Sequence, residues 1–156
     1  MFLLICAIRQ IWRKKKKLVR CSSGYLNPTQ DKLTLCIDLD NTLIYSSVKK
    51  LNDSGCFIDN KFYVYRRPYL DDFLHTASQY CNLVIYTAST QEYADRVIDF
   101  IDRNRYISGR YYRSDCINID NKWFKDISKH GYEEHQTIII DDLPHCHLKY
   151  KSNICR

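Results

Sequence analysis

Two aspartates separated by one leucine, Asp38 and Asp40, have the residue types and the spacing needed for chemistry. They follow an apolar run at residues 33–37 that is rich in strand-forming residues. Because alternate side chains of a strand point the same way, both carboxylates are expected to emerge together at its carboxyl end. A parallel α/β sheet opens its binding crevice at that end. Two carboxylates there repel each other and lose hydration, so they predict a bound cation or a reactive pair.

Two other apolar runs also end in polar residues. The run at 82–86 is followed by Thr87, and the run at 136–140 is followed by Asp141 and Asp142. If these runs are parallel strands of one sheet, their carboxyl ends bring all of these side chains to one site. Helix N-capping, a role that Asp and Thr fill well, would explain one residue at one strand end. It would not explain doubled carboxylates at two strand ends.

The elements that must position these residues alternate between strands and helices. Helical spacing of apolar residues predicts helices over 69–80 and 90–103, and a further strand is expected at 107–112. This alternation favours an α/β fold with a three-layer, Rossmann-like parallel sheet and right-handed crossovers. Short β-like pieces within 44–67, separated by turn residues, predict a small hairpin or a three-stranded insertion.

The size and charge of the chain indicate one globular domain after a basic tail. The chain has 156 residues, and seven of its 24 Lys and Arg residues lie within 1–20, where there is no acidic residue. The remainder carries 17 basic and 18 acidic residues, so no direct nucleic-acid binding is expected from the domain. We therefore expect a tail and linker over 1–29 and a folded domain over 30–156.

The tail has three open interpretations. Residues 2–8 are apolar but too few to span a membrane, and basic residues follow them, the reverse of a signal peptide. The tail is a mobile extension, a nuclear localisation patch at 13–17 for an import receptor, or an apolar segment that dips into an anionic membrane surface.

The eight cysteines favour reduced thiols and an intracellular location, in the nucleus or cytoplasm. No two are spaced as Cys-x-x-Cys, and several lie within apolar runs, where a thiol packs as a small hydrophobe. The cluster His145-Cys146-His147 could ligate a metal, but it lacks a second pair at zinc-site spacing.

The segment Asp38-Leu-Asp40-Asn-Thr42-Leu43 resembles the Asp-x-Asp-x-Thr signature of phosphatases of the haloacid dehalogenase superfamily. Further segments resemble the branch that dephosphorylates the carboxyl-terminal domain of RNA polymerase II, the NLI-interacting-factor-like phosphatases. In chain order they are Arg67-Pro68, Tyr86-Thr87-Ala-Ser89 with Tyr93-Ala-Asp95, Tyr112-Arg113-Ser-Asp-Cys116, Phe124-Lys125-Asp126-Ile-Ser128 and Ile140-Asp141-Asp142-Leu-Pro144. Their order and spacing over residues 33–146 make a chance match implausible.

The resemblance implies a role for each matching residue. Asp38 would be the nucleophile that forms an aspartyl-phosphate, and Asp40 would be the general acid and base. One Mg²⁺ would be held by the Asp38 carboxylate, the Asp40 main-chain carbonyl and Asp142. Asp141 would support these ligands without touching the ion, or would contact it through a water molecule. Lys125 would offset the phosphoryl charge. The phosphate would be bound by Thr87, Ala88, Thr42 and Arg113, although a salt-bridging surface role would explain Arg113 equally well.

The implied function is that of a magnesium-dependent protein serine/threonine phosphatase. The intervals from Asp38 to Thr87 and from Lys125 to Asp141 are too short for a full cap domain beside the core elements, which favours an open, capless site. An exposed phosphorylated segment, such as the RNA polymerase II carboxyl-terminal domain, therefore fits better than a small enclosed metabolite. Tyr93 is expected either to contact such a peptide or to pack in the core.

The chain departs from the family pattern after residue 142. The family continues with a helix and a fifth strand, whereas only residues 151–154 could begin that strand here. The sheet is therefore expected to end after its fourth core strand, with an open edge. This departure keeps an alternative open, a catalytically weak or inactive binding module like the relatives that serve mitochondrial protein import. The intact set of site residues favours the enzyme.

Overall fold

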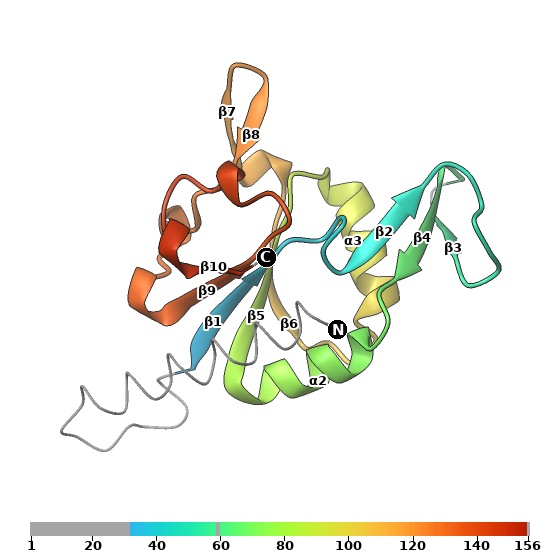
Figure 1. Cartoon of the computed structure of the whole chain (residues 1–156), viewed down its shortest axis with the longest axis horizontal. Helices are drawn as coiled ribbons and strands as arrows, with labels where there is room; N and C mark the ends of the chain where they lie inside the picture. The colour runs from blue at the N-terminus through green and yellow to red at the C-terminus, as the bar shows by residue number, and fades with distance from the viewer. Residues whose placement is uncertain (1–31, 59, 156) are drawn as a thin grey trace.

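The computed structural model describes residues 32–58 and 60–155, and its centre is a five-stranded parallel sheet (Figure 1). The strand order is β10-β9-β1-β5-β6. The middle strand, β1, pairs in parallel with β5 on one side and with β9 on the other. The strands of this sheet are β1 (Leu33–Ile37), β5 (Cys81–Tyr86), β6 (Ile107–Tyr111), β9 (Thr137–Ile140) and β10 (Ile154–Cys155).

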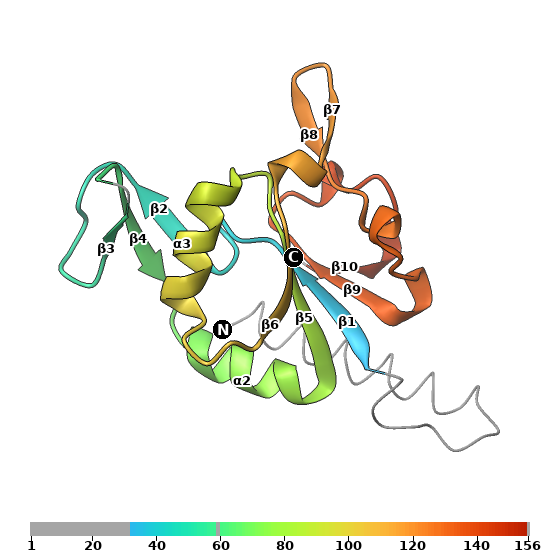
Figure 2. The same ribbon diagram turned by 180° about the vertical axis from the view of Figure 1, so that it is seen from behind.

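The two faces of the sheet are covered by different structures among the described residues. Leu35 of β1 belongs to the larger apolar core, which it shares with the buried sides of α2 (Leu70–Tyr80) and α3 (Gln91–Ile101). Both helices lie beside β5 and β6 (Figures 1 and 2). Cys36 belongs to a second cluster with Ile127, which comes from a 3-10 helix. The 3-10 helices are η1 (Arg113–Asp115), η2 (Ile127–His130), η3 (Glu134–Gln136), η4 (Pro144–Cys146) and η5 (Lys151–Asn153).

The two α-helices begin and end within two residues of their predicted bounds. Helix α2 follows Pro68 and begins after Tyr69, whose left-handed φ of 64° turns the chain into the helix. Its buried side includes Phe73, and that of α3 includes Val97 and Ile101, in the periodic positions that the sequence indicates. Helix α3 connects β5 to β6, so it forms the parallel crossover expected from the alternating pattern.

The insertion between β1 and α2 is a small antiparallel sheet, which confirms the three-stranded alternative. Its strands, in the order β2-β4-β3, are β2 (Ile44–Ser47), β3 (Cys56–Ile58) and β4 (Phe62–Arg66). Gly55 lies against the ring of Tyr65, where an added Cβ would come within 2.6 Å of a ring carbon. A larger residue would displace that ring, so the close approach of Tyr65 favours glycine in the turn before β3.

A hairpin that the sequence analysis did not predict projects from the body and leads into Lys125 (Figure 1). It consists of β7 (Ile117–Ile119) and β8 (Lys122–Phe124). The two turn residues, Asp120 and Asn121, have positive φ values of 49° and 60°. Two-residue hairpin turns favour this geometry, and Asp and Asn tolerate it better than most residues.

The strand at one edge of the central sheet is short. β10 contributes Ile154 and Cys155, which pair with Ile139 and Ile140 of β9. The expectation that the sheet ends after its fourth core strand is therefore not confirmed, because a fifth strand is present with two residues.

The predicted tail and linker at 1–29, with the basic run at 13–17, lie outside the described residues. No helix within 32–58 and 60–155 combines the length and the apolar character needed to cross a membrane. Within these ranges, Cys36, Cys56, Cys116 and Cys146 have free thiols.

Candidate active site

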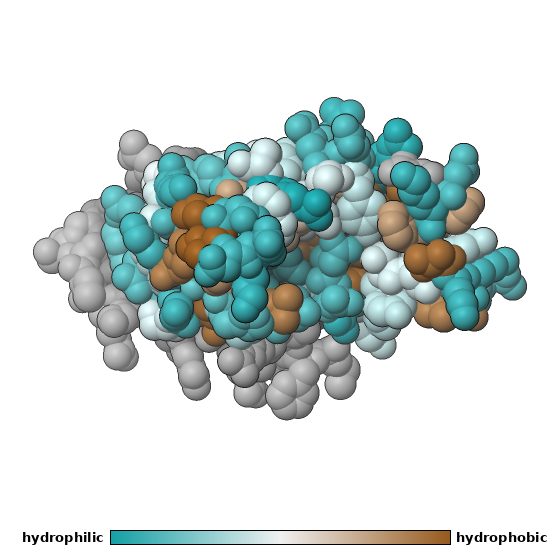
Figure 3. All heavy atoms as spheres, turned by 90° about the horizontal axis from the view of Figure 1, so that it is seen from above, coloured by the Kyte–Doolittle hydropathy of each residue, from teal (hydrophilic) through white to brown (hydrophobic). Residues whose placement is uncertain are grey.

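A cavity of about 560 Å³ lies where β1, β5 and β9 end. Its lining includes the residues that follow these strands, Asp38, Thr87 and Asp141, so the three strand ends meet as predicted. Lys125, which follows β8, lines the same cavity. Seen from above, the molecule is mainly hydrophilic, with separate hydrophobic patches (Figure 3).

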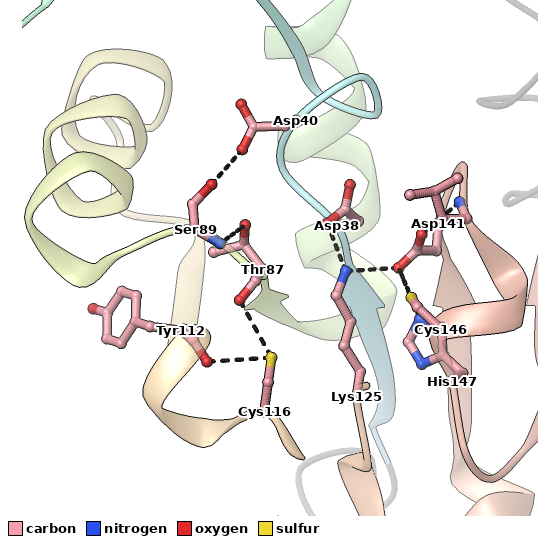
Figure 4. Close-up of polar contacts among 11 residues, drawn as sticks. Asp38, Asp40, Thr87, Ser89, Tyr112, Cys116, Lys125, Asp141, Cys146 and His147 are labelled. Atoms are coloured by element: carbon pink, nitrogen blue, oxygen red, sulfur yellow. Dashed lines mark hydrogen bonds and ion pairs between the residues drawn. The ribbon is translucent and has the colours of Figure 1, made fainter. Parts of the chain in front are cut away.

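Lys125 joins two of the strand-end carboxylates directly. Its Nζ lies 2.6 Å from Oδ1 of Asp38 and 2.7 Å from Oδ2 of Asp141. Figure 4 shows the ammonium group reaching between them. No more than 8% of any of these three side chains is exposed. Each buried charge therefore depends on the others, because an unpaired ion at this depth would be strongly unfavourable.

Burial and charge shift the acid–base behaviour of this cluster. Burial raises the pKa of Asp38 to about 6, although the ammonium of Lys125 acts in the opposite direction. Burial also acts to raise the pKa of Asp141, but hydrogen bonding to His147 and the charge of Lys125 outweigh it and hold that pKa below its usual value. Burial lowers the pKa of Lys125, yet the two carboxylates outweigh it and raise that pKa above its usual value. At neutral pH the cluster is thus two carboxylates and one ammonium.

Asp40 is held by three hydroxyl groups. Ser89 donates a hydrogen bond to its Oδ2 at 2.8 Å (Figure 4), Tyr93 donates to its Oδ1 at 2.8 Å, and Ser46 donates to the same oxygen at 3.4 Å. Tyr93 lies in α3 and Ser46 in β2, so two separate elements fix this carboxylate. Sequence reasoning missed Ser46 and Ser89 as site residues, although Ser89 stands inside one of the segments that resemble the family.

The turn after β5 forms the side of the cavity predicted to bind phosphate. Thr87 is buried, and its Oγ1 accepts a hydrogen bond from the Ser89 amide at 3.1 Å. Ala88 lines the cavity, and its carbonyl accepts a hydrogen bond from Nε of Arg113 at 2.7 Å. The Arg113 guanidinium also lies 5.7 Å from the centre of the Trp123 ring. Arg113 is therefore held at the cavity by contacts on two sides.

Thr42, the remaining residue predicted to bind phosphate, does not line the cavity. It is buried, and its Oγ1 has no hydrogen-bond partner among the described residues. It lies in a tight turn in which the amides of Leu43 and Ile44 both donate to the carbonyl of Leu39. Thr42 therefore supports the turn beside Asp40 without facing the cavity, and its role in phosphate binding stays a prediction.

Three carboxylates in the site lie close enough together to bind one metal ion. Ligand oxygens of Asp38, Asp141 and Asp142 all lie within 4.8 Å of one another. Partial burial and the charge of Asp141 raise the pKa of Asp142, which is the sign of crowded negative charge. A small, hard cation such as Mg²⁺ prefers oxygen ligands of this kind, and its charge would offset their repulsion. The donor set therefore fits the predicted Mg²⁺.

A second group of donors, which sequence reasoning did not place at the site, gathers around Asp141. Nε2 of His147 lies 2.8 Å from Oδ2 of Asp141, and Sγ of Cys146 lies 3.6 Å from the same oxygen. The Lys125 amide donates to the Cys146 carbonyl at 2.8 Å, and the Leu148 amide donates to the Lys125 carbonyl at 3.0 Å. One short segment thus holds both the backbone of Lys125 and the side chain of Asp141. The sequence feature that could have revealed this group is Cys146 followed directly by His147.

One protein family and several of its named members match this chain. The model of the family described as NLI interacting factor-like phosphatase matches residues 33–156. A Dictyostelium discoideum protein named "Probable C-terminal domain small phosphatase" is 36% identical over 127 residues, which are 77% of this chain and 42% of that protein. The human "Carboxy-terminal domain RNA polymerase II polypeptide A small phosphatase 2" is 32% identical over 131 residues, which are 80% of this chain and 48% of that protein.

A solved structure shares the fold. The fission yeast RNA polymerase II CTD phosphatase Fcp1, bound to beryllium fluoride, superposes with a TM-score of 0.65 at 19% identity. The match covers 92% of this chain and 44% of that chain. At this identity the likeness shows the fold alone. The chain spans less than half the length of each of these three proteins.

Proposed function

This chain belongs to the NLI interacting factor-like phosphatases, and we propose that it hydrolyses phosphoserine or phosphothreonine in exposed protein segments. The observation that carries the proposal is the contact of Lys125 with both Asp38 and Asp141 inside one cavity. The contact supports phosphatase chemistry because it combines a carboxylate nucleophile, a cation that offsets phosphoryl charge, and further carboxylates for a metal.

In the first half of the proposed reaction the phosphoryl group moves to the protein. An oxygen of Asp38 attacks phosphorus, and the bond between phosphorus and the serine or threonine oxygen breaks. Asp40 donates a proton to that oxygen, so the free hydroxyl leaves and an aspartyl-phosphate remains. The pKa of Asp38, about 6, leaves it mostly ionised at neutral pH, as a nucleophile must be.

In the second half water releases the phosphate. Asp40, now ionised, takes a proton from a water molecule, whose oxygen attacks phosphorus. The bond between phosphorus and Asp38 breaks, which frees inorganic phosphate and restores the carboxylate. The three hydroxyls on Asp40 hold its carboxylate in one orientation for both proton transfers.

Asp38, Asp141 and Asp142 would hold the Mg²⁺, and we propose the main-chain carbonyl of Asp40 as a further ligand. When bound, the ion supplies positive charge that stabilises the phosphoryl oxygens. Lys125 supplies a second positive charge, 2.6 Å from Oδ1 of Asp38, while Thr87 and Arg113 are the proposed phosphate contacts of this chain.

The shape of the site supports a protein segment as the substrate. The described residues between β1 and β5 form only the small insertion and α2, which leaves the cavity open to solvent at one side. Phe62, Tyr93, Trp123 and Leu143 line its rim, and such apolar and aromatic groups suit an extended peptide. The human relative is named for the RNA polymerase II carboxyl-terminal domain, so a phosphoserine peptide of that domain is our first candidate substrate.

Hydrolysis of para-nitrophenyl phosphate and of a phosphoserine peptide tests the proposal. We expect turnover with Mg²⁺, none with EDTA, and a loss of about a thousandfold or more in Asp38→Asn. Asp72→Asn is the matched control, because Asp72 lies exposed on α2 and away from the cavity. Turnover that survives Asp38→Asn would overturn the nucleophile, and a wild-type chain inactive on both substrates would overturn the enzyme.

We propose a nuclear or cytoplasmic location, in keeping with a relative named for the carboxyl-terminal domain of RNA polymerase II and with the free thiols of Cys36, Cys56, Cys116 and Cys146. A phosphorylated protein segment is the proposed partner. Contact of the basic tail with an anionic membrane surface or an import receptor stays a prediction from the sequence, because residues 1–29 lie outside the described ranges.

A further inference from the structure

Cys146, His147 and Asp141 bring three different metal-ligating groups together beside the proposed magnesium site. The imidazole nitrogen, the thiol sulfur and the carboxylate oxygen all lie within 4.8 Å of one another. Figure 4 shows them gathered around the end of Asp141, with Lys125 reaching the same carboxylate from the side of Asp38. We infer that these three residues form a second cation site, selective for zinc-class ions, whose occupation inhibits the enzyme.

Two of the three distances between the donor atoms are close to those in a tetrahedral zinc site. Zinc bonds of about 2.0 Å to nitrogen and oxygen and about 2.3 Å to sulfur place neighbouring ligand atoms about 3.3 to 3.6 Å apart. Oδ2 of Asp141 lies 2.8 Å from Nε2 of His147 and 3.6 Å from Sγ of Cys146. The sulfur already lies at the zinc-site distance from this oxygen, and a side-chain movement of about half an ångström would bring the imidazole nitrogen to it.

The chemistry of the donors separates this site from the magnesium site. Thiolate and imidazole are ligands for zinc-class ions, whereas the all-oxygen set of Asp38, Asp141 and Asp142 suits magnesium. An ion that binds at Cys146 must displace the thiol proton, which zinc does readily and magnesium does not.

Inhibition follows from the shared carboxylate. Oδ2 of Asp141 already accepts a hydrogen bond from Lys125, and the same oxygen faces Cys146 and His147. A divalent cation bound to this oxygen would repel the ammonium of Lys125. It would also remove Asp141 from the ligands available to magnesium. Cys146 lines the catalytic cavity, so an ion can reach the site from solvent. This part of the inference rests on the proposed phosphatase function.

Cobalt(II) is the probe for binding, because its complexes with thiolates absorb in the near ultraviolet. We expect the metal-free full chain, titrated with Co²⁺ in excess Mg²⁺, to develop this absorption, and Cys146→Ser to lower the cobalt affinity by about tenfold or more. Cys56→Ser is the matched control, because Cys56 is a free, half-buried thiol in β3. Asp38→Asn should keep the absorption. An unchanged titration in Cys146→Ser would overturn the site.

Alkylation of the wild-type chain gives a test that needs no variant. Zinc should slow the reaction of iodoacetamide with Cys146 relative to Cys56, as measured by peptide mass spectrometry, and magnesium should not. Equal rates with and without zinc would overturn the site, whether or not the variants fold.

Inhibition is measured separately. We expect zinc to inhibit hydrolysis of para-nitrophenyl phosphate in excess magnesium, with the inhibitory concentration raised about tenfold or more in Cys146→Ser. Equal inhibition of both proteins would overturn the regulatory part. A chain without phosphatase activity would overturn the proposed function, while the cobalt and alkylation results would still decide the metal site.

Discussion

The hydroxyl of Tyr93 donates a 2.8 Å hydrogen bond to the carboxylate of Asp40, across 53 residues of sequence. The sequence suggested that Tyr93 contacts a peptide or packs in the core, and the structure shows in addition that it positions the proposed general acid. Its ring also meets Phe62 edge-on, with centroids 5.7 Å apart. Helix α3 and the insertion are therefore linked through the residue that orients Asp40.

Tyr93→Phe should slow phosphoserine hydrolysis more than nitrophenyl phosphate hydrolysis. The variant keeps the ring but loses the hydrogen bond, and an alkoxide leaving group needs protonation by Asp40 more than nitrophenolate does. We expect kcat for a phosphoserine peptide to fall about tenfold. Tyr45→Phe, on an exposed ring of β2, is the control. An equal fall with both substrates would contradict the role in proton transfer.

Lys125→Met should destabilise the metal-free chain. The substitution leaves Asp38 and Asp141 buried without the ammonium between them, at a cost of about 3 kcal/mol in the free energy of unfolding. Magnesium should restore part of this loss, because it supplies the missing positive charge. Urea unfolding in EDTA and in Mg²⁺ measures both effects, with the exposed Lys61→Met as control. A variant as stable as the wild type in EDTA would show that the ion pair does not stabilise the fold.

The pKa of Asp38 predicts that the stability of Asp38→Asn relative to the wild type increases with pH in the metal-free protein. The folded-state pKa of about 6 lies above the ordinary value of 3.8, so the contribution of Asp38 to stability is full below pH 3.8 and is lost as the pH rises through 6. Asparagine does not titrate, so the free energy of unfolding of Asp38→Asn relative to that of the wild type should rise by about 2 to 3 kcal/mol between pH 4 and pH 7. Chemical unfolding in EDTA at several pH values checks this. A constant difference across that range, or a pH dependence that Asp72→Asn changes equally, would contradict it.

Magnesium should raise the midpoint temperature of unfolding, and Asp142 should contribute to this effect as a ligand of the ion. An ion that binds only the folded state stabilises it by about 2.7 kcal/mol at a concentration one hundred times its Kd. Asp142→Asn removes one of the three clustered carboxylates and should raise the magnesium concentration needed for the same shift about tenfold. Thermal melts over a magnesium series measure this, and Asp72→Asn should behave like the wild type. Identical magnesium curves for Asp142→Asn and the wild type would exclude Asp142 as a ligand.

Local patterns were sufficient to predict the strand ends that meet in the cavity. Asp38, Thr87 and Asp141 each follow a short apolar run, and the carboxyl ends of parallel strands share one edge of a sheet. Lys125 had no such local signal, because it follows a hairpin and belongs to no periodic segment. It was found only through the resemblance of Phe124-Lys125-Asp126-Ile-Ser128 to the family.

The supporting contacts could not be predicted because they depend on tertiary placement. Ser89 reaches Asp40 across 49 residues, and His147 reaches Asp141 only because the chain turns back through η4. The hairpin of β7 and β8 was missed for a different reason, since its alternating strands are only three residues long. The paired Asp120 and Asn121 were the signal for its turn.

The position of Asp141 near the edge of the sheet has a consequence for local opening. The amide of Asp38 donates to the Ile140 carbonyl in the middle of the sheet, whereas the amide of Asp141 donates at 3.3 Å to the carbonyl of Cys155 in the two-residue strand β10. Separating β10 breaks far fewer contacts than separating β1 from β9, so the amide of Asp141 should exchange its hydrogen with solvent well before that of Asp38. One of the two carboxylates that bind Lys125 is thus expected to lie in a less protected part of the sheet than the other.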